Sequence, residues 1–303
     1  MLRLLSATLI WAFSFGLIGS QLTGLDAGWV ALCRLLTAVI VFSPFLWRSS
    51  MGARDLWVLC GIGAVQFGLM YSFYLSAFQF IEAYLVAAFT AFTPIWVALI
   101  GGLWERKLDW AILSLAVFAF LGAWIIRESP LLDGEAIWIG FALMQIANFC
   151  FACGQVAFRR WSRQSSVPAH RSMLYLYVGG AGVALLYFGA RVLLGIQGST
   201  SPSLSQIGII VYLGVIASGL GFFLWNSGAA HVSNGVLAVS NNWVVPVGVA
   251  LAIPMAGSQP DWPSFGLGAT VIVAASVGVE LRARSMSKKP DQSVVGIDAK
   301  RPS

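Results

Sequence analysis

The sequence predicts an all-α polytopic membrane protein whose ten transmembrane helices form two inverted five-helix repeats (5+5). Composition is the first observation behind this prediction: 58% of the 303 residues are hydrophobic, only 10% are charged, and the mean hydropathy is +0.82. A soluble domain of this size cannot bury so much apolar surface. The second observation is that the apolar residues form ten runs, and the third is that one pattern recurs 152 residues later.

Each of the ten runs is close to the roughly 20 residues that a helix needs to cross a bilayer. Short connections separate the runs, and most contain the Pro, Gly, Ser or charged residues that interrupt helices. Arg3 followed by the first run also resembles a signal peptide, but its removal would leave the first repeat one helix short. We therefore expect transmembrane helices at residues 3–21, 28–47, 55–76, 82–103, 109–126, 135–157, 172–194, 205–227, 233–254 and 264–281.

Two prolines indicate the repeat. Pro94 lies near the middle of the fourth run, and Pro246 lies at the equivalent place in the ninth run, 152 residues later. The same shift superposes two Asp-Trp pairs, Asp109-Trp110 and Asp261-Trp262. We interpret the chain as two copies of one structural unit.

The first repeat is expected at residues 1–127, the second at 128–283, and a disordered cytoplasmic tail at 284–303. Because five is an odd number of helices, the second repeat enters the membrane from the opposite side, which makes the repeats inverted. Inverted repeats are typical of secondary transporters, whose substrate site lies near the membrane midplane where the repeats meet.

The basic residues predict the orientation in the membrane. With ten spans, 15 of the 18 Lys and Arg residues fall on the side that holds both termini, and two fall on the other side. Positively charged loops stay in the cytoplasm. We therefore expect a multi-pass protein of the bacterial inner (plasma) membrane with both termini in the cytoplasm.

Polar residues beside the two prolines predict a cavity with two hinges. Proline lacks a backbone donor and displaces the carbonyl four residues earlier, and such a carbonyl within a membrane must face protein or a water-filled space. Pro94 and Pro246 are therefore predicted hinges, and the alternative is a pair of kinks sealed by helix packing. The predicted lining beside them includes Thr90, Asn241 and Asn242.

An amide stripe on the sixth run predicts further substrate contacts. Gln145, Asn148 and Gln155 fall on one helical face. Amides are costly in lipid, so this face is expected to point into the protein. Asn148, the central residue, is the stronger candidate, with Gln145 beside it. Hydrogen bonds between helices are the alternative role.

Aromatic and polar-tipped residues complete the predicted substrate site. Aromatic rings can form cavity walls and stack on planar or cationic solutes, although membrane proteins also use them as interface anchors. The candidates are Trp11, Phe15, Tyr71, Tyr74, Trp225 and Asn226.

Arg34 is the one basic residue within a predicted span. We expect its long side chain to snorkel to the outer surface or to make a structural contact; the alternative is that it faces the cavity and holds a carboxylate. No acidic residue lies deep in a predicted span, which favours a facilitator or exchanger over a proton-coupled carrier.

The sequence offers no catalytic constellation. The chain has two histidines, and no nucleophile-base set, phosphate loop or metal-ligand spacing is recognisable. Cys150 and Cys153 form a C-x-x-C within a helix, without a second pair, and are expected to be small packing residues. We therefore predict that the protein is not an enzyme and has no catalytic residues, no metal and no cofactor.

Short motifs, in their order, resemble the EamA-type exporters of the drug/metabolite transporter (DMT) superfamily. They are Leu9-Ile-Trp-Ala-Phe-Ser-Phe15, Arg34-Leu-Leu-Thr-Ala38, Ala91-Phe-Thr-Pro94, Leu103-Trp-Glu105 and Leu108-Asp-Trp110. The resemblance covers about residues 4–283 and implies export of small metabolites, often amino acids, through a central cavity lined by both repeats. The second copy departs from the pattern with Gly257 in place of Glu105 and an additional Pro254, so the substrate is not carried over.

The expected function is therefore metabolite export, that is, efflux of amino acids or related amphipathic compounds by alternating access between the two repeats. The expected partners are a small-molecule substrate and the lipid bilayer, with no nucleic acid, and the expected assembly is a monomer. An importer or exchanger of similar solutes is the first alternative. A membrane protein without transport activity, such as an enzyme or a receptor, is the second.

Overall fold

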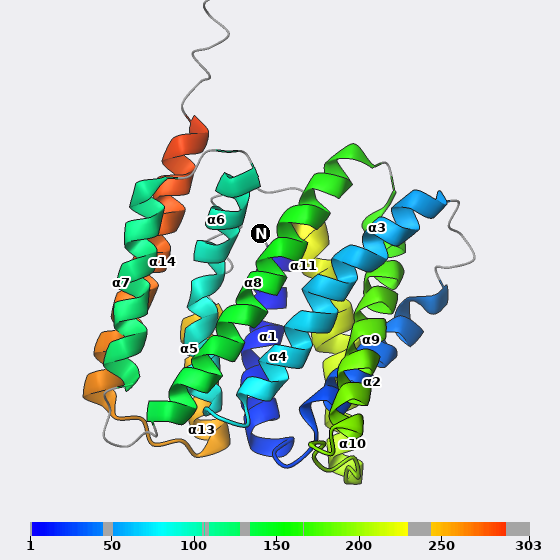
Figure 1. Ribbon diagram of the computed structural model, residues 1–303, viewed down its shortest axis with the longest axis horizontal. Helices are drawn as coiled ribbons and strands as arrows, with labels where there is room; N and C mark the ends of the chain where they lie inside the picture. The colour runs from blue at the N-terminus through cyan, green and yellow to red at the C-terminus, as the bar shows by residue number, and fades with distance from the viewer. Residues whose placement is uncertain are drawn as a thin grey trace, which may run out of the picture.

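The computed structural model describes residues 2–44, 51–104, 106, 109–127, 134–165, 167–229 and 244–288. Within these ranges the regular secondary structure is helical, apart from one isolated bridge between Leu25 and Ser199 (Figure 1). The α-helices are α1 (Leu2–Gln21), α2 (Ala27–Phe42), α3 (Ala53–Gly63), α4 (Met70–Ala77), α5 (Ala83–Phe89), α6 (Thr93–Trp104), α7 (Trp110–Arg127), α8 (Gly134–Gln164), α9 (Ala169–Leu193), α10 (Leu204–Tyr212), α11 (Gly221–Ala229), α13 (Val244–Ala256) and α14 (Trp262–Lys288). Three short segments of different pitch join some of them: the π-helices η2 (Ala64–Leu69) and η4 (Leu213–Leu220) and the 3₁₀ turn η3 (Thr90–Phe92).

Several of these pieces are continuous along the chain and form longer rods. In the described ranges, seven rods are long and apolar enough to cross a membrane. Three further apolar helices are shorter, at Ala27–Phe42, Trp110–Ile126 and Val244–Ala256. The all-helical membrane class is confirmed, and the described helices fall in or close to the predicted runs, although residues 45–47 of the second run and 233–243 of the ninth lie outside the described residues. The count of ten spans stays a prediction, because the three shorter helices do not reach the length of a full span.

The helix ends gather on two sides of the molecule. In Figure 1 the connections between α1 and α2, between α9 and α10 and between α13 and α14 lie at the lower side. The end of α6, the end of α8 and the end of α14 lie at the upper side. The rods therefore run alternately up and down, as expected for a chain that is threaded repeatedly through a bilayer.

The two halves of the chain make matching helix contacts. The first helix of the first half, α1, packs against α13 and α11, and the first helix of the second half, α8, packs against α6 and α4. Likewise α2 packs against η4, whereas α9 packs against η2. A π-helix lies within the third rod of each half, at Ala64–Leu69 and at Leu213–Leu220.

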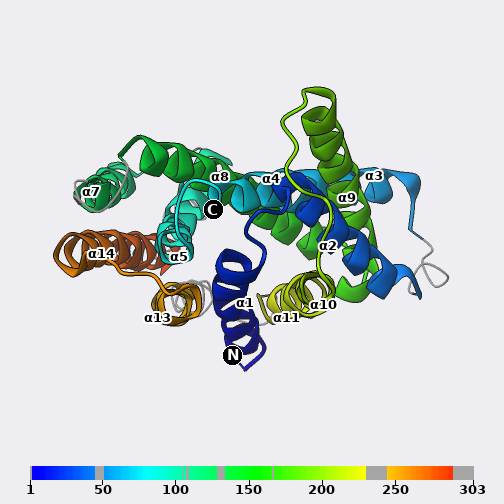
Figure 2. The same cartoon turned by 90° about the horizontal axis from the view of Figure 1, so that it is seen from below.

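Glycines allow two pairs of helices to approach at backbone distance. A Cβ on Gly63 would lie 1.8 Å from the Leu176 carbonyl oxygen, and one on Gly179 would lie 1.9 Å from the Cys60 carbonyl oxygen, so α3 and α9 touch backbone to backbone. At the opposite edge of the molecule, α7 and α14 lie side by side (Figure 2). Small residues at such crossings are how membrane helices gain close packing.

Candidate substrate-binding cavity

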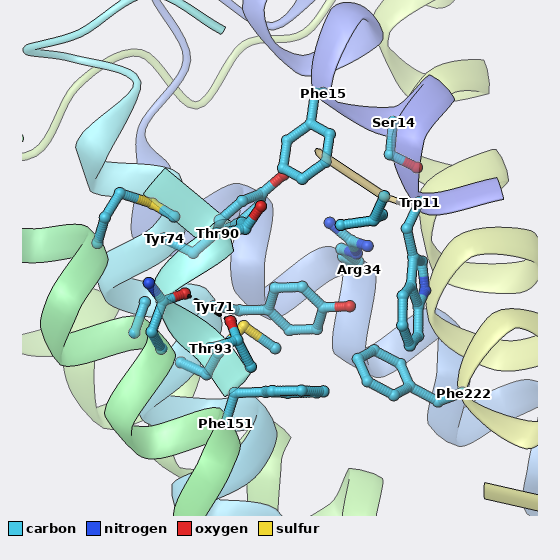
Figure 3. A pocket seen from close by; sticks show the side chains of 15 residues that line it. Trp11, Ser14, Phe15, Arg34, Tyr71, Tyr74, Thr90, Thr93, Phe151 and Phe222 are labelled. Carbon is cyan, nitrogen blue, oxygen red and sulfur yellow. Dashed lines mark hydrogen bonds between the residues drawn. The ribbon is translucent and has the colours of Figure 1, made fainter. Parts of the chain in front are cut away.

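A central cavity of about 100 Å³ lies where α1, α2, α4, α8 and α11 meet the broken rod formed by α5, η3 and α6 (Figure 3). A single water needs roughly 10–15 Å³ of such space, so the cavity has room for a small solute. Its lining consists of Trp11, Ser14, Phe15, Arg34, Met70, Tyr71, Tyr74, Thr90, Thr93, Met144, Ala147, Asn148, Phe151, Phe222 and Val244.

Aromatic rings make up much of the cavity wall. The Trp11 ring lies 4.7 Å from the Phe222 ring and 6.5 Å from the Phe151 ring, measured between centroids. Across the cavity the Phe15 and Tyr74 rings meet edge to face at 6.0 Å. Such walls favour a solute with an apolar or planar body.

The π-helix η4 accepts hydrogen bonds from two aromatic side chains, Trp11 in the cavity wall and the buried Tyr177. In a π-helix the backbone hydrogen bonds span five residues, which widens the turn and often marks a functional site. The Trp11 indole N–H donates to the Ala217 carbonyl over 2.9 Å, and the Tyr177 hydroxyl donates to the Ser218 carbonyl over 2.6 Å. Because both carbonyls belong to η4, this segment sets the orientation of Trp11 at the cavity wall.

Arg34 brings a positive charge to the same wall. Its Nε donates to the Ser218 hydroxyl over 2.7 Å, and its guanidinium carbon lies 4.1 Å from the centre of the Tyr71 ring. Only 2% of the residue is exposed. Of the two expected roles, snorkelling to the surface is therefore wrong, because the side chain is held inside, whereas the structural contact is observed, with Ser218 and Tyr71. The alternative placement beside the cavity is observed as well.

The break near Pro94 contributes polar groups. The rod changes from α5 to the 3₁₀ turn at Thr90 and resumes as α6 at Thr93, so the Thr90 carbonyl accepts from the Thr93 N–H. Asn148 Nδ2 donates to the Phe89 carbonyl over 2.9 Å, and Thr93 Oγ1 donates to Asn148 Oδ1 over 3.2 Å. The amide thus satisfies a carbonyl that the break releases, as backbone within a membrane requires.

The structure brings together six of the predicted site residues and places three others elsewhere. Gln145 accepts from the Trp96 indole over 3.0 Å, Trp225 is buried behind Trp11 at 5.2 Å between ring centroids, and Asn226 donates to the Met173 sulfur over 3.4 Å. None of these three lines the cavity. Asn241 and Asn242 lie outside the described residues, and the predicted hinge Pro246 lies within α13. The six that line the cavity are Trp11, Phe15, Tyr71, Tyr74, Thr90 and Asn148.

Some lining residues were missed although the sequence holds a signal for them. Met144, Ala147 and Phe151 lie on the same face of α8 as Asn148, at helical spacing. Extending the amide stripe to its apolar neighbours would have found them. Phe222 lies one turn before Trp225 on the same rod, and no feature of the sequence separates the ring that lines the cavity from the buried ring that does not.

Among the described residues, the lining carries a single charged residue. Arg34 supplies it, and no Asp or Glu is among the described residues that line the cavity. Nor does any group of three or more His, Cys, Asp and Glu side chains that could hold a metal ion come together in the described ranges. The described lining therefore offers recognition by rings, hydroxyls, one amide and one guanidinium.

Outside the cavity, a partly buried ion pair joins the two halves at the lower side of Figure 1. The Asp26 carboxylate accepts from Arg191 Nε over 2.9 Å, from the Gly198 N–H over 2.8 Å and from the Trp29 N–H over 2.9 Å. Burial alone would raise the pKa of Asp26, but the two backbone N–H groups and the guanidinium together hold it below its ordinary value. Asp26 therefore caps α2 and ties the α1–α2 connection to the α9–α10 connection.

A larger cleft of about 840 Å³ lies among α3, α6 and α8. Trp161 donates to Asp55 over 3.0 Å, and the Arg160 guanidinium lies 5.4 Å from the Trp104 ring centre. Because the start of α3 and the ends of α6 and α8 lie at the upper side of Figure 1, this cleft and the Asp26 ion pair are at opposite ends of the helices.

Comparison with known proteins shows full-length relatives. The chain is 36% identical over 277 residues to a "Biotin transporter" of Salmonella typhimurium and 35% identical over 277 residues to one of Escherichia coli (strain K12), with 91% of each chain covered. It is 38% identical over 275 residues to a "Probable biotin transporter" of Pseudomonas aeruginosa, covering 90% of this chain and 94% of that one.

Family and fold comparisons agree with these relatives. Residues 1–127 match the model of the EamA-like transporter family. A solved crystal structure aligns with a TM-score of 0.62 over 93% of this chain and 97% of the other, at 20% identity, which supports the fold. The all-helical membrane architecture, the cavity and the full-length relatives together show that this chain belongs to the EamA-like transporter family of the DMT superfamily and is a membrane transporter rather than an enzyme.

Proposed function

We propose that this chain is a secondary carrier that moves biotin, or a solute of similar chemistry, across the bacterial inner membrane through the central cavity. The observation that carries the proposal is the cavity itself, which is aromatic on most sides and has polar groups at Thr90, Thr93 and Asn148. Biotin has an apolar ring system, a polar ureido group and a carboxylate on an aliphatic chain. Rings and polar groups of the lining suit these parts, and the relatives' names favour biotin over the amino acids expected from the sequence.

Alternating access between two inverted repeats is the proposed mechanism. The matching contacts of α1 and α8, and the two π-helices at equivalent places, support the inverted 5+5 arrangement. The Asp26 ion pair bridges the halves at one side while the larger cleft lies at the other, as expected for one of two exchanging states. The excess of basic residues on the side of the termini supports a cytoplasmic location for both.

The direction of net transport is proposed to follow the substrate gradient. No carboxylate among the described lining residues offers a site for proton coupling. Export, uptake and exchange are then one cycle run under different gradients, and export occurs when the internal concentration is higher.

Counterflow in proteoliposomes tests this proposal. Vesicles are preloaded with unlabelled biotin, amino acids or short monocarboxylates, and labelled biotin is offered outside. We expect saturable biotin accumulation only with preloaded biotin or close analogues. Accumulation of an amino acid instead would contradict the substrate, and no accumulation of any solute by folded protein would contradict the carrier.

A matched pair of variants links transport to the cavity. Ala147→Phe places a ring in the lining, whereas Leu186→Phe adds a ring to a side chain that is 73% exposed on α9. We expect Ala147→Phe to abolish counterflow and Leu186→Phe to retain it, with both eluting as folded protein. Full activity of Ala147→Phe would show that the pathway lies elsewhere.

A further inference from the structure

We propose that the Arg34 guanidinium binds the carboxylate of the transported solute, so that the cavity selects monocarboxylates with an apolar body. This inference rests on the proposed transport function and adds the anionic group that the site recognises. It assigns to Arg34 a contact with substrate rather than a purely structural role.

The Arg34 side chain is held in place with donor capacity left over. A guanidinium carries five N–H donors. Nε is used by the Ser218 hydroxyl, and the Tyr71 ring supports one face of the group. Nη1 is buried and has no hydrogen-bond partner in the described part of the chain. Figure 3 shows the group at the cavity between Trp11 and Tyr71.

The positive charge has no counterion among the described residues that line the cavity. A buried charge without an opposite charge is costly, and an ionisable residue within a membrane usually marks a functional site. Neither Asp nor Glu occurs among the described lining residues. The buried Asp26 is already bonded to Arg191, Gly198 and Trp29. A solute carboxylate would supply the missing charge.

The neighbours of Arg34 are arranged to keep its orientation. The Ser218 hydroxyl contacts the Tyr71 hydroxyl at 3.1 Å as well as Arg34 Nε, and the Ser218 carbonyl accepts from Tyr177. All four residues are buried. A guanidinium fixed at Nε can present its other N–H groups to a carboxylate with little loss of side-chain entropy.

The remaining lining suits the rest of such a solute. Trp11, Phe151 and Phe222 lie close to one another and offer an apolar wall. Asn148 and Thr93 provide hydrogen-bonding groups on α8 and α6, whereas Arg34 lies on α2. The cavity thus offers an anion-binding group and a neutral polar pair on different helices.

Competition binding with a charged and a neutral ligand tests the proposal. Purified full-length protein in nanodiscs binds tritiated biotin, and unlabelled biotin or biotinamide, in which the carboxylate is a neutral amide, competes. We expect biotin to compete about 10- to 100-fold better, as the loss of a charge-assisted hydrogen bond predicts. In Arg34→Gln the two competitors should differ by no more than about twofold, and Arg34→Lys should restore part of the preference for biotin.

Arg163→Gln is the matched control, because it removes the same charge from an exposed position on α8. Its preference for biotin over biotinamide should equal that of the wild type. A merely structural Arg34 would weaken both ligands alike and leave their ratio unchanged. If Arg34→Gln does not fold, Ser218→Ala, which removes the Nε acceptor, is expected to reduce the ratio by a smaller factor.

The outcomes separate this inference from the function beneath it. Equal competition by biotin and biotinamide in the wild type would overturn the carboxylate assignment while leaving biotin transport intact. Absence of biotin binding and counterflow in folded wild-type protein would instead overturn the proposed function, and the inference with it.

Discussion

The Trp11 side chain has two roles: its ring lines the cavity, and its indole N–H holds it to η4. Its ring faces Phe222 at the cavity, and its N–H bonds to the Ala217 carbonyl. Trp225, directly behind it, has a similar ring, but its indole nitrogen has no partner within the described ranges. Substitution of Trp11 therefore removes part of the cavity wall and a hydrogen bond. Substitution of Trp225 removes a buried ring that does not line the cavity.

We expect Trp11→Ala to weaken biotin binding at least about 10-fold, because it removes ring contacts with the solute, and Trp11→Phe to weaken it less. Trp225→Phe should leave affinity within about twofold, since that residue lies outside the lining. Tritiated biotin binding measures all three. A larger loss in Trp225→Phe than in Trp11→Ala would contradict the assigned roles.

Two amides on α8 differ in the same respect, because Asn148 lines the cavity whereas Gln145 does not. Asn148→Ala should lower both thermal stability, by about 1–3 kcal/mol for the released Phe89 carbonyl, and biotin affinity. Gln145→Ala removes only the bond to Trp96 and should lower stability without changing affinity. Melting in detergent and equilibrium binding distinguish the two effects. Unchanged affinity in Asn148→Ala would remove Asn148 from the proposed site.

For single residues, the sequence predicted which residue types would line the cavity but not the direction in which each side chain points. Polarity within a membrane indicated Asn148 correctly as inward, yet Gln145, three residues earlier, turns to Trp96 instead. Side chains three residues apart on a helix point in directions that differ by about 60°. This difference is enough for Asn148 to face the cavity while Gln145 faces the neighbouring helix α6. For Arg34, the partner that retains it is Ser218, 184 residues away, and no local pattern predicts such a contact.

Among the elements, helix positions were predictable and helix pitch was not. Most expected spans begin and end within three residues of the observed rods, because lipid requires long apolar runs. The sixth is longer, since α8 continues to Gln164 through charged residues that favour helix but carry no membrane signal. The π-helices η2 and η4 have no recognised sequence signature, so the carbonyls that orient Trp11 and Tyr177 could not be foreseen.

The α3–α9 crossing makes a sharp prediction about packing. Gly179→Ala would place a Cβ 1.9 Å from the Cys60 carbonyl oxygen, and because the obstacle is backbone, we expect destabilisation of about 1–3 kcal/mol. Gly182→Ala, on the same helix, meets nothing within 4 Å and should be neutral or stabilising by up to about 1 kcal/mol. Thermal unfolding in detergent compares them. Equal melting temperatures would show that the two helices are further apart than described.

Over the whole molecule, stability is coupled to pH through Asp26. Because its folded pKa is lowered, the carboxylate stabilises the fold above the pKa of the unfolded chain, about 4, and this contribution is lost as the pH falls through the lower folded value. At pH 7, Asp26→Asn should be less stable by about 1–3 kcal/mol.

The test is the melting temperature of wild type and Asp26→Asn from pH 7 to pH 3. The difference in melting temperature between the two proteins should become smaller as the pH falls, because the Asp26 carboxylate of the wild type becomes protonated. Asp55→Asn, which alters an acid at the opposite end of the helices, is the control for general acid effects. A difference that stays constant across the range would show that the charge of Asp26 contributes nothing.

The contact between α7 and α14 bears on how such a chain could arise. A Cβ on Gly122 would lie 2.6 Å from the Gly268 carbonyl oxygen, and one on Gly268 would lie 2.5 Å from the Gly122 carbonyl oxygen. Under the shift of 152 residues, Gly122 corresponds to Ala274 and Gly268 to Ala116, so both halves carry small residues at both positions. A surface of this kind is self-complementary. Under the inverted-repeat arrangement proposed above, an ancestral protein of one half, inserted into the membrane in both orientations, would have dimerised through this surface. Gene duplication and fusion would then have joined the two copies in one chain and let each copy diverge.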